Sequence, residues 1–324
     1  MKYDISVIVM TYHPIWTKLK STLLSILCQT GIHYEIIISD DGSEDTCFQQ
    51  IETLFREHNF TCYKLIHAEQ NHGTCKNYFC ALVEAESEFV KPISPGDCLY
   101  LQNCLERWLQ FMKKHKATVS FSNALFYNFK NGQFQIQQHS HIAPIDATVY
   151  DRHDLEACRI GCLVLHDFVL GATFLAQTLL LRRYCQKIID AGVIYTEDTM
   201  FRWMLFHGIQ IYHFAEDALL YEVGTGISTS KNKYWQALIQ KDTKVVEQEL
   251  LNEVCIDVFQ KRYQMYIRKK CKMKADSYKW FRYICFPEAI KRKLQQKKLI
   301  NSDREVASLN VDSSYLEKLM LKGE

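Results

Sequence analysis

Short apolar runs alternate along the first hundred residues with segments whose apolar residues recur every three or four positions. Short runs that are rich in β-branched residues and end at turn formers are typical of buried strands, whereas the recurring spacing is typical of amphipathic helices. The predicted strands are 5–11, 34–40, 62–67 and 89–93, and the predicted helices are 15–29, the region around 51–55, and 75–85. Strands that alternate with helices predict an α/β fold with a mostly parallel, Rossmann-like sheet and helices on its faces.

The pattern is less regular after residue 100, and residues 138–165 fit neither period. Further helices are predicted over 101–114, 183–191 and 197–206, and further strands over 118–121, 178–181, 209–214 and 219–223. The composition shifts after 224–228, and the Lys-, Gln- and aromatic-rich stretch 233–300 contains no turn signals, which favours helices. We therefore expect an α/β domain over residues 1–230 and a helical C-terminal region over 231–324.

The composition is that of a folded protein. Of 324 residues, 48% are hydrophobic and 23% charged, which excludes a mainly disordered chain. There is no apolar run long enough for a spanning helix, and the N-terminus leads straight into a strand, so we expect no signal peptide. The thirteen cysteines are odd in number and form no C-x-x-C pair, which indicates reduced thiols and a cytoplasmic location.

The charge is unevenly distributed, although the chain as a whole carries only +2. Between Lys261 and Lys298 there are 14 Lys and Arg against 2 Asp and Glu, a local net charge of +12, so the rest of the chain carries −10. Seven aromatic residues are interleaved with these cations: Tyr263, Tyr266, Tyr278, Trp280, Phe281, Tyr283 and Phe286. Three interpretations stay open for this stretch: a solvated helix face, a nucleic-acid surface, or a surface that docks on anionic membrane.

Polar residues follow the predicted strands, where ligands of parallel sheets bind. Tyr12 could stack on a base, Asp40 or Asp41 could accept hydrogen bonds from a base or ribose, Lys76 could neutralise phosphate, and Asp97 could hold a divalent cation. This inventory suits a nucleotide diphosphate. Taken alone, the Asp-Asp-Gly-Ser string is also an ordinary turn before a capped helix.

Five motifs in order resemble a family 2 glycosyltransferase across about the first 225 residues. They are Ile8-Val-Met-Thr-Tyr, Ser39-Asp-Asp-Gly-Ser-Glu-Asp, Asn71-x-Gly-x-x-Lys-Asn77, the 94–97 loop and Glu197-Asp198. The resemblance implies a GT-A fold, a nucleotide-sugar donor (by family frequency a UDP-sugar) and inversion at the anomeric carbon. A dehydrogenase or a P-loop enzyme is disfavoured because neither glycine motif occurs.

The resemblance also implies roles for individual residues in binding the donor. Thr11, Tyr12 and one of Asp40 and Asp41 would contact the nucleobase and ribose. Lys76 stands where the family has arginine and would hold phosphate as a point charge rather than through a bidentate fork. Gly226 and Ser228 would close over the diphosphate.

The metal motif departs from the family pattern. Where the family has Asp-x-Asp, residues 94–97 read Ser-Pro-Gly-Asp, so only Asp97 remains to hold Mg²⁺ or Mn²⁺ together with the donor diphosphate. Two alternatives follow. Asp97 could simply cap a helix starting near Leu99, and the protein could be a catalytically silent nucleotide-sugar sensor or scaffold.

The acidic pair Glu197-Asp198 matches the family's acidic pair at the head of a helix. An inverting displacement needs a general base at the acceptor hydroxyl, and we assign this role to Asp198, with Glu197 orienting. A helix N-terminus would hold Asp198 ionised. If the family resemblance is set aside, the simpler interpretation is that the two carboxylates only interact favourably with the helix dipole.

Acceptors of such enzymes are often polyprenol-linked saccharides in bacterial capsule, O-antigen or exopolysaccharide synthesis. For the basic stretch 261–298, the resemblance therefore favours an anionic membrane surface over a nucleic acid. The predicted location is cytoplasmic, peripheral on the inner face of the plasma membrane.

Overall fold

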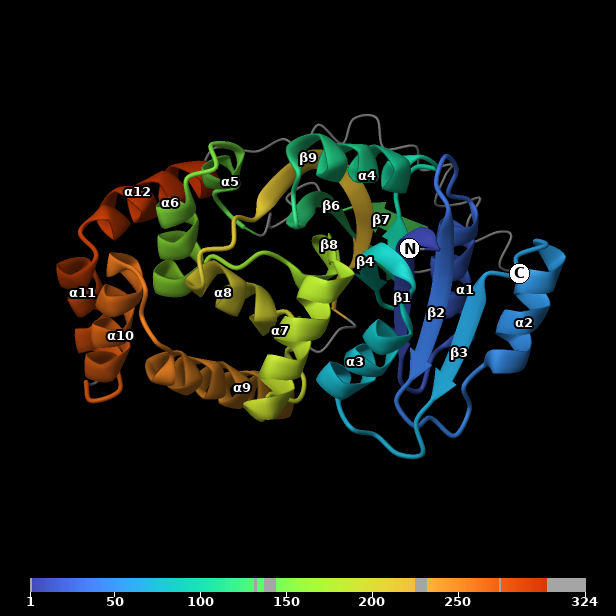
Figure 1. Cartoon of the computed structure of the whole chain (residues 1–324), viewed down its shortest axis with the longest axis horizontal. Helices are drawn as coiled ribbons and strands as arrows, with labels where there is room; N and C mark the ends of the chain where they lie inside the picture. The colour runs from blue at the N-terminus through green and yellow to red at the C-terminus, as the bar shows by residue number, and fades with distance from the viewer. Residues whose placement is uncertain (1, 131–132, 137–143, 225–231, 274, 302–324) are drawn as a thin grey trace.

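The first half of the chain has the predicted alternation of strands and helices (Figure 1). The computed structural model describes residues 2–130, 133–136, 144–224, 232–273 and 275–301. The first seven elements are β1 (Tyr3–Thr11), α1 (Trp16–Leu27), β2 (Tyr34–Asp40), α2 (Phe48–Glu57), β3 (Tyr63–His67), α3 (Thr74–Glu84) and β4 (Ser87–Ile93). All seven were predicted, to within a few residues.

These strands form the parallel part of one sheet. β1 pairs in parallel with β2 and β4, and β2 pairs in parallel with β3. In register, Thr11 lies beside Asp40 and Asp40 beside His67, so three strands end level with one another. Figure 1 shows the arrowheads of β2 and β3 at the lower edge of the view, where α9 (Lys233–Asn252) also lies.

The second half adds antiparallel strands and more helices. Its strands and α-helices up to residue 222 are β5 (Cys98–Leu99), α4 (Cys104–His115), β6 (Val119–Lys130), β7 (Gln133–Ile136), α5 (Thr148–Asp151), α6 (Leu155–Arg159), β8 (Phe174–Gln177), α7 (Thr178–Asp190), α8 (Thr199–Phe206) and β9 (Tyr212–Glu222). The described strands run in the order β3-β2-β1-β4-β8-β6-β9-β5, with β7 beside β6. β8 pairs antiparallel with both β4 and β6 and so links the parallel part to the rest of the sheet.

Three predictions for this half need correction. The strand predicted over 178–181 is wrong: those residues begin α7, and the strand is β8 just before them. A four-residue apolar run cannot distinguish a strand from one buried turn of helix. The strand predicted at 118–121 continues to Lys130, and the two late strands are the single strand β9, which pairs with β6 across a register shift at Ser122–Ala124.

The sheet separates two apolar clusters, and alternate residues of β1 enter different ones. Ile8 joins the cluster that contains residues of α3, α7 and α8. Val7 and Val9 join the cluster that contains residues of α1, α2 and α4. Packing on both sides of the strands holds the strand ends, and the loops that leave them, in a fixed frame.

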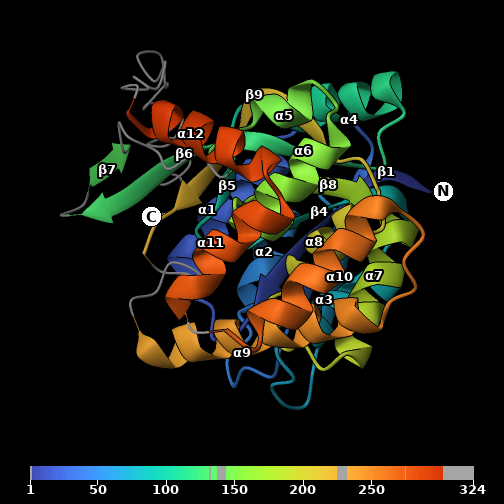
Figure 2. The same ribbon diagram turned by 90° about the vertical axis from the view of Figure 1, so that its left-hand side faces the viewer.

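The C-terminal region is helical, as predicted, and comprises α9, α10 (Val258–Lys270), α11 (Ala275–Cys285) and α12 (Glu288–Asn301) (Figure 2). Its apolar residues enter the same cluster as α3 and α7, among them Val246, Leu250 and Ala289. Three of its aromatics, Tyr263, Tyr266 and Phe286, are also buried there. These three rings stabilise the fold and cannot insert into a membrane, contrary to our expectation for the whole aromatic set.

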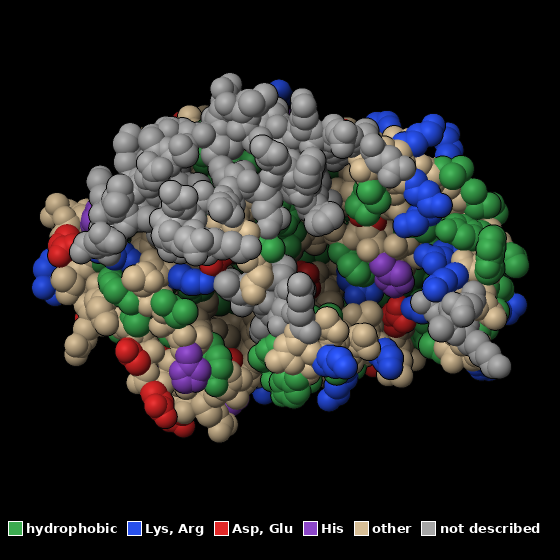
Figure 3. Space-filling model, turned by 180° about the vertical axis from the view of Figure 1, so that it is seen from behind, with side chains coloured by type: hydrophobic (Ala, Val, Ile, Leu, Met, Phe, Trp, Pro, Cys, Tyr) green, Lys and Arg blue, Asp and Glu red, His purple; other side chains and the backbone are tan. Residues whose placement is uncertain are grey.

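Another part of this region does carry exposed apolar residues. Trp280 and Ile284 on α11 are 76% and 75% exposed, and Ile290 and Leu294 on α12 are also exposed. Figure 3 shows hydrophobic and basic side chains side by side over the end of the molecule formed by α10–α12, at the right of that view. None of the helices in the described ranges is both long and apolar enough to cross a membrane.

Candidate active site

Asp40, the last residue of β2, is completely buried and joins the ends of three strands. Its carboxylate accepts hydrogen bonds from Thr11 Oγ1 (2.8 Å), Ser43 N (2.8 Å) and Ser43 Oγ (2.7 Å), and His67 Nδ1 lies 3.1 Å from Oδ1. A carboxylate offers about four acceptor positions. Because all of them are used inside the protein, Asp41 is the better candidate of the acidic pair for a contact with the donor.

Asp41 begins the loop after β2 and connects it to the loop after β3. Its Oδ1 accepts the N–H of His72 and its Oδ2 that of Gly73, both at 2.9 Å, and burial raises its pKa. Gly42 next to it has φ +83°, and a Cβ there would lie 2.5 Å from the carbonyl carbon of Gln70. The Asp-Asp-Gly-Ser turn therefore requires glycine, and it holds both loops in close contact.

α3 is fastened to the same edge of the sheet. Ser39 Oγ donates to Asn77 Oδ1 at 2.6 Å, and Asn77 Nδ2 donates back to the Ser39 carbonyl at 3.0 Å. Lys76, one residue earlier, is exposed in the first turn of α3 and forms no ion pair with a described residue. Tyr12, which follows β1, is 52% exposed, so its ring is available to a ligand.

The segment before α8 crosses the N-terminus of α3. Cys75 N donates to the Ile194 carbonyl at 3.0 Å, and Gly73, at φ +90°, lies so close to Ile194 that there is no room for a Cβ. The next residue, Tyr195, has a raised pKa because it is partly buried and because Tyr234, Asp242, Asp41 and Tyr12 lie nearby. Because the N–H of Gly73 is bonded to Asp41, the segment lies beside the loop that follows β2.

Glu197 and Asp198 follow on this segment and remain partly accessible to solvent. Asp198 is the N-cap residue of α8, but its side chain makes no capping hydrogen bond, and its Cβ lies close to Gly171. The expected support of the Asp198 charge by a capping hydrogen bond is missing: burial raises the pKa of Asp198, and the charge of Arg202, one turn later, lowers it. Burial and the neighbouring Asp198 charge together raise the pKa of Glu197 to about 8.

Asp97 lies in the loop between β4 and β5 and is buried. Its Oδ1 accepts the N–H of Glu222 at 3.0 Å, and burial raises its pKa to about 7. Lys91, which is completely buried, has its pKa lowered to about 8. The Glu222 carboxylate accepts two hydrogen bonds from Lys18 Nζ, at 2.7 and 2.8 Å. The alternative helix-cap role of Asp97 is wrong, because Leu99 belongs to β5 and α4 begins only at Cys104.

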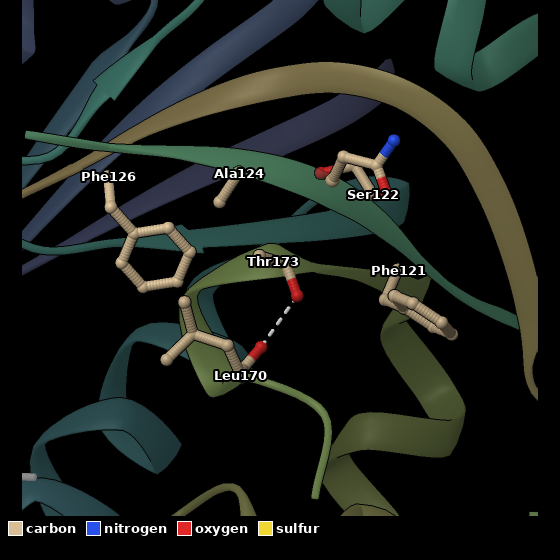
Figure 4. Close-up of a pocket in the computed structure, with 7 residues that line it drawn as sticks. Phe121, Ser122, Ala124, Phe126, Leu170 and Thr173 are labelled. Atoms are coloured by element: carbon tan, nitrogen blue, oxygen red, sulfur yellow. Dashed lines mark hydrogen bonds between the residues drawn. The ribbon is translucent and has the colours of Figure 1, made fainter. Parts of the chain in front are cut away.

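The short turn at residues 170–173 lies between Asp97 and Asp198. Lys91 Nζ, whose charge acts on Asp97, donates to the Ala172 carbonyl at 2.5 Å, while Gly171 packs against Asp198. Figure 4 shows this turn beside β6, closed by the hydrogen bond from Thr173 Oγ1 to the Leu170 carbonyl (2.7 Å). The cavity between the turn and β6 has a volume of about 10 Å³, room for about one water molecule, so it cannot hold a sugar.

A divalent ion fits this arrangement only if the donor supplies most of the ligands. Among the residues that the structure describes, no three His, Cys, Asp or Glu side chains come together as a metal site. Magnesium often binds one or two carboxylates and takes its other oxygens from phosphate and water. Asp97 can supply such a carboxylate. Gly226 and Ser228, the predicted diphosphate loop, lie outside the described residues.

The sequence interpretation missed several contributors to the site. Asp242 on α9 bonds to the segment before Glu197, Arg202 faces Asp198, and Lys91 links Asp97 to the 170–173 turn. Only Arg202 had a detectable signal, its i,i+4 spacing from Asp198. A different hollow of about 360 Å³, lined by residues at the amino ends of the strands such as Tyr3 and His33, lies away from all of these groups.

The fold and site define an α/β enzyme of the GT-A type. Residues 6–169, just over half of the chain, match the family described as Glycosyl transferase family 2. The chain therefore belongs to glycosyl transferase family 2, and it is a glycosyltransferase that uses a nucleotide-sugar. A search of curated proteins found no significant match.

Solved structures agree on the fold. TarS of S. aureus, residues 1–349, is 20% identical with a TM-score of 0.53, over 81% of this chain and 69% of that one. The same fragment in complex with UDP-GlcNAc is 19% identical with a TM-score of 0.52, over 81% and 70%. Another TarS structure is 19% identical with a TM-score of 0.52, over 82% of this chain but only 43% of that one. At these identities the likeness concerns the fold alone.

Proposed function

We propose that this enzyme transfers a sugar from a UDP-sugar to a hydroxyl of a saccharide acceptor, with inversion at the anomeric carbon. One observation carries the proposal: residues 194–198, which include both acidic residues, cross the N-terminus of α3 beside Gly73, whose N–H is bonded to Asp41 just after β2. Inverting transfer is one displacement, which needs a base on the acceptor side and charge stabilisation on the leaving-group side. The site offers both kinds of group on neighbouring loops.

In this proposal Asp198 removes the proton of the acceptor hydroxyl, and Glu197 orients the reacting groups. Tyr12 and Asp41 receive the nucleobase and ribose, while Thr11 and Asp40 hold the strand ends that present them. Lys76 is exposed and can turn toward phosphate, and Gly226 and Ser228 complete the diphosphate site. A Mg²⁺ or Mn²⁺ ion held by Asp97 and the diphosphate would neutralise charge on the leaving group.

The donor assignment is supported by the family and by the TarS complex with UDP-GlcNAc. A thermal-shift panel of UDP-, dTDP- and GDP-sugars, with and without manganese, identifies the nucleotide, and release of the nucleoside diphosphate in the presence of saccharide acceptors tests turnover. We expect stabilisation by a UDP-sugar and acceptor-dependent release. Donor binding without hydrolysis or transfer would instead support the silent sensor or scaffold.

We further propose that the acceptor is linked to a polyprenol and that residues 231–324 bring the catalytic domain, 1–230, to an anionic membrane. The support is the pairing of exposed apolar residues with exposed cations on α11 and α12. Trp280 and Ile284 lie one turn apart on α11, Ile290 and Leu294 one turn apart on α12, and Lys291 is exposed beside them. Such a face suits lipid headgroups, with aromatic and aliphatic side chains below the phosphates and cations level with them.

Flotation with liposomes tests this docking. We expect the protein to float with anionic vesicles and not with neutral ones, and the double variant Trp280→Ala/Ile284→Ala to float less. Leu179→Ala is the matched control, because Leu179 is 66% exposed but lies on α7. Equal partition onto neutral and anionic vesicles, or equal losses in both variants, would exclude the proposed surface.

A further inference from the structure

Asp242 on α9 binds the backbone of the segment that carries the two acidic residues. Its Oδ2 accepts the N–H groups of Tyr195 (2.8 Å) and Thr196 (3.1 Å) and the Thr196 hydroxyl (3.2 Å). Its Oδ1 accepts the N–H of Ile194 at 3.4 Å. One carboxylate thus takes three consecutive backbone N–H groups, an arrangement that binds an anion strongly and fixes the backbone that donates to it.

This contact is buried and supported by the inner face of α9. Asp242 is 2% exposed, and Val246 and Leu250, one and two turns later, are in the core. Trp235, two turns before Asp242 on the same face, packs edge-on against Tyr195 at a ring-centroid distance of 5.5 Å. Two independent side chains of one helix therefore hold the same short segment.

The held segment leads directly to Glu197 and Asp198. Apart from α9, its described backbone contacts are few: the Ile194 carbonyl accepts Cys75 N at 3.0 Å, and the Thr196 carbonyl accepts Thr199 N at 3.1 Å and Thr199 Oγ1 at 2.7 Å. Asp242 binds the three residues immediately before the acidic pair. Loss of its carboxylate would release their N–H groups and let the direction of Asp198 change.

We propose that Asp242 is a positioning residue for sugar transfer, which acts by fixing the backbone from which Asp198 projects. The inference rests on the proposed role of Asp198 and deepens it, because it makes α9, beyond residue 230, part of the catalytic apparatus. Asp242 itself touches neither donor nor acceptor. Its removal should therefore lower kcat and leave donor binding nearly unchanged.

The test compares Asp242→Asn with Glu247→Gln in the full chain. Glu247 is a matched control: it is a buried carboxylate on the same helix, its ion pair is with Lys270 at 2.7 Å, and none of the hydrogen bonds that the structure describes for residues 194–198 involves it. We expect Asp242→Asn to lower kcat about ten- to a hundredfold, as for a misplaced catalytic group, with the donor KM within about twofold. Glu247→Gln should keep the wild-type kcat even if its melting temperature falls as much as that of Asp242→Asn.

A second variant and a second measurement keep the test decisive. Thr196→Val removes one of the hydrogen bonds to Asp242, and we expect kcat to fall by a few-fold, about the effect of one hydrogen bond. If Asp242→Asn does not fold, the kcat of Thr196→Val decides the test. Hydrogen exchange of the amides at 194–196 should accelerate in Asp242→Asn and stay unchanged in Glu247→Gln.

The outcomes separate this inference from the proposed function. A wild-type chain without turnover on any donor defeats the proposed function, and hydrogen exchange still decides whether Asp242 holds the segment. Wild-type turnover with unchanged kcat in Asp242→Asn, or equal kcat losses in Asp242→Asn and Glu247→Gln, overturns the positioning role. A raised donor KM with unchanged kcat overturns it as well.

Discussion

The two neighbouring carboxylates at residues 197 and 198 should respond differently to removal of their charge. Burial raises the pKa of both, and the charge of Asp198 adds to the rise for Glu197, whose pKa is about 8. The two carboxylates interact, so the pair loses its two protons in separate steps. A pKa of about 8 leaves Glu197 mostly protonated near neutral pH, and we assign the charge that a general base needs to Asp198.

The magnitude follows from the pKa of Glu197. With a pKa of about 8, about nine Glu197 side chains in ten are protonated at pH 7. Glutamine resembles the protonated acid in size and in its ability to donate a hydrogen bond, so Glu197→Gln should keep kcat within about threefold at that pH. Asp198→Asn removes the base and should lower kcat by about 10²–10⁴-fold, while nucleotide affinity survives.

The assay is steady-state release of the nucleoside diphosphate at saturating donor and acceptor, from pH 6 to 9. Glu52→Gln serves as the control, because Glu52 is an exposed carboxylate on α2. A Glu197→Gln variant as inactive as Asp198→Asn at pH 7 would refute the assignment of the proton to Glu197. Full activity of Asp198→Asn would refute the assignment of Asp198 as the general base.

Three further predictions concern stability and the metal. The pKa of Glu197 rises from 4.5 to about 8 on folding, so its contribution to stability is fully present below pH 4.5 and is lost as the pH rises through 8. Between pH 4.5 and 8, the melting temperature of the wild type should therefore fall relative to that of Glu197→Gln in thermal denaturation. A constant difference between the two melting temperatures would contradict the shift. Gly42→Ala should lower the free energy of unfolding by about 1–3 kcal/mol in urea titrations, since its positive φ and the nearby Gln70 backbone oppose a Cβ, whereas Gly161→Ala, with no atom near its Cβ position, should not suffer this loss. Excess chelator should abolish transfer, and Asp97→Ala should remove the effect of manganese on nucleotide affinity in titration calorimetry; undiminished transfer in chelator would exclude the metal.

The N-terminal half of the fold was predictable because its local patterns are strong. In β2, for example, a β-branched apolar run stops at an Asp-Asp-Gly-Ser turn, and the predicted bounds 34–40 are those of the strand. Positions 178–181 misled because Thr178 and Leu181 are buried while Leu179 is exposed, a pattern that four residues cannot resolve into helix or strand. Short apolar runs acquire their structure from packing that lies elsewhere in the chain.

The candidate site was predictable only as a set of residues at strand ends. The sequence does not show that the carboxylate oxygens of Asp40 are bonded to Thr11, Ser43 and His67, because those contacts join residues up to 29 positions apart. Asp242 was hidden for the same reason: its hydrogen bonds span 46 to 48 residues. The raised pKa values of Glu197 and Asp198 depend on burial, which becomes visible only once the chain is folded.

The central claim is that the loops after β1 and β2, together with Asp198, form one site for donor and acceptor. A crystal structure of Asp198→Asn with an intact UDP-sugar tests it most directly, because this variant should bind the donor without turning it over. We expect the base beside Tyr12 and Asp41 and the anomeric carbon facing the amide of residue 198. A donor bound elsewhere, for instance in the hollow at the amino ends of the strands, or a sugar turned away from residue 198, would contradict the account.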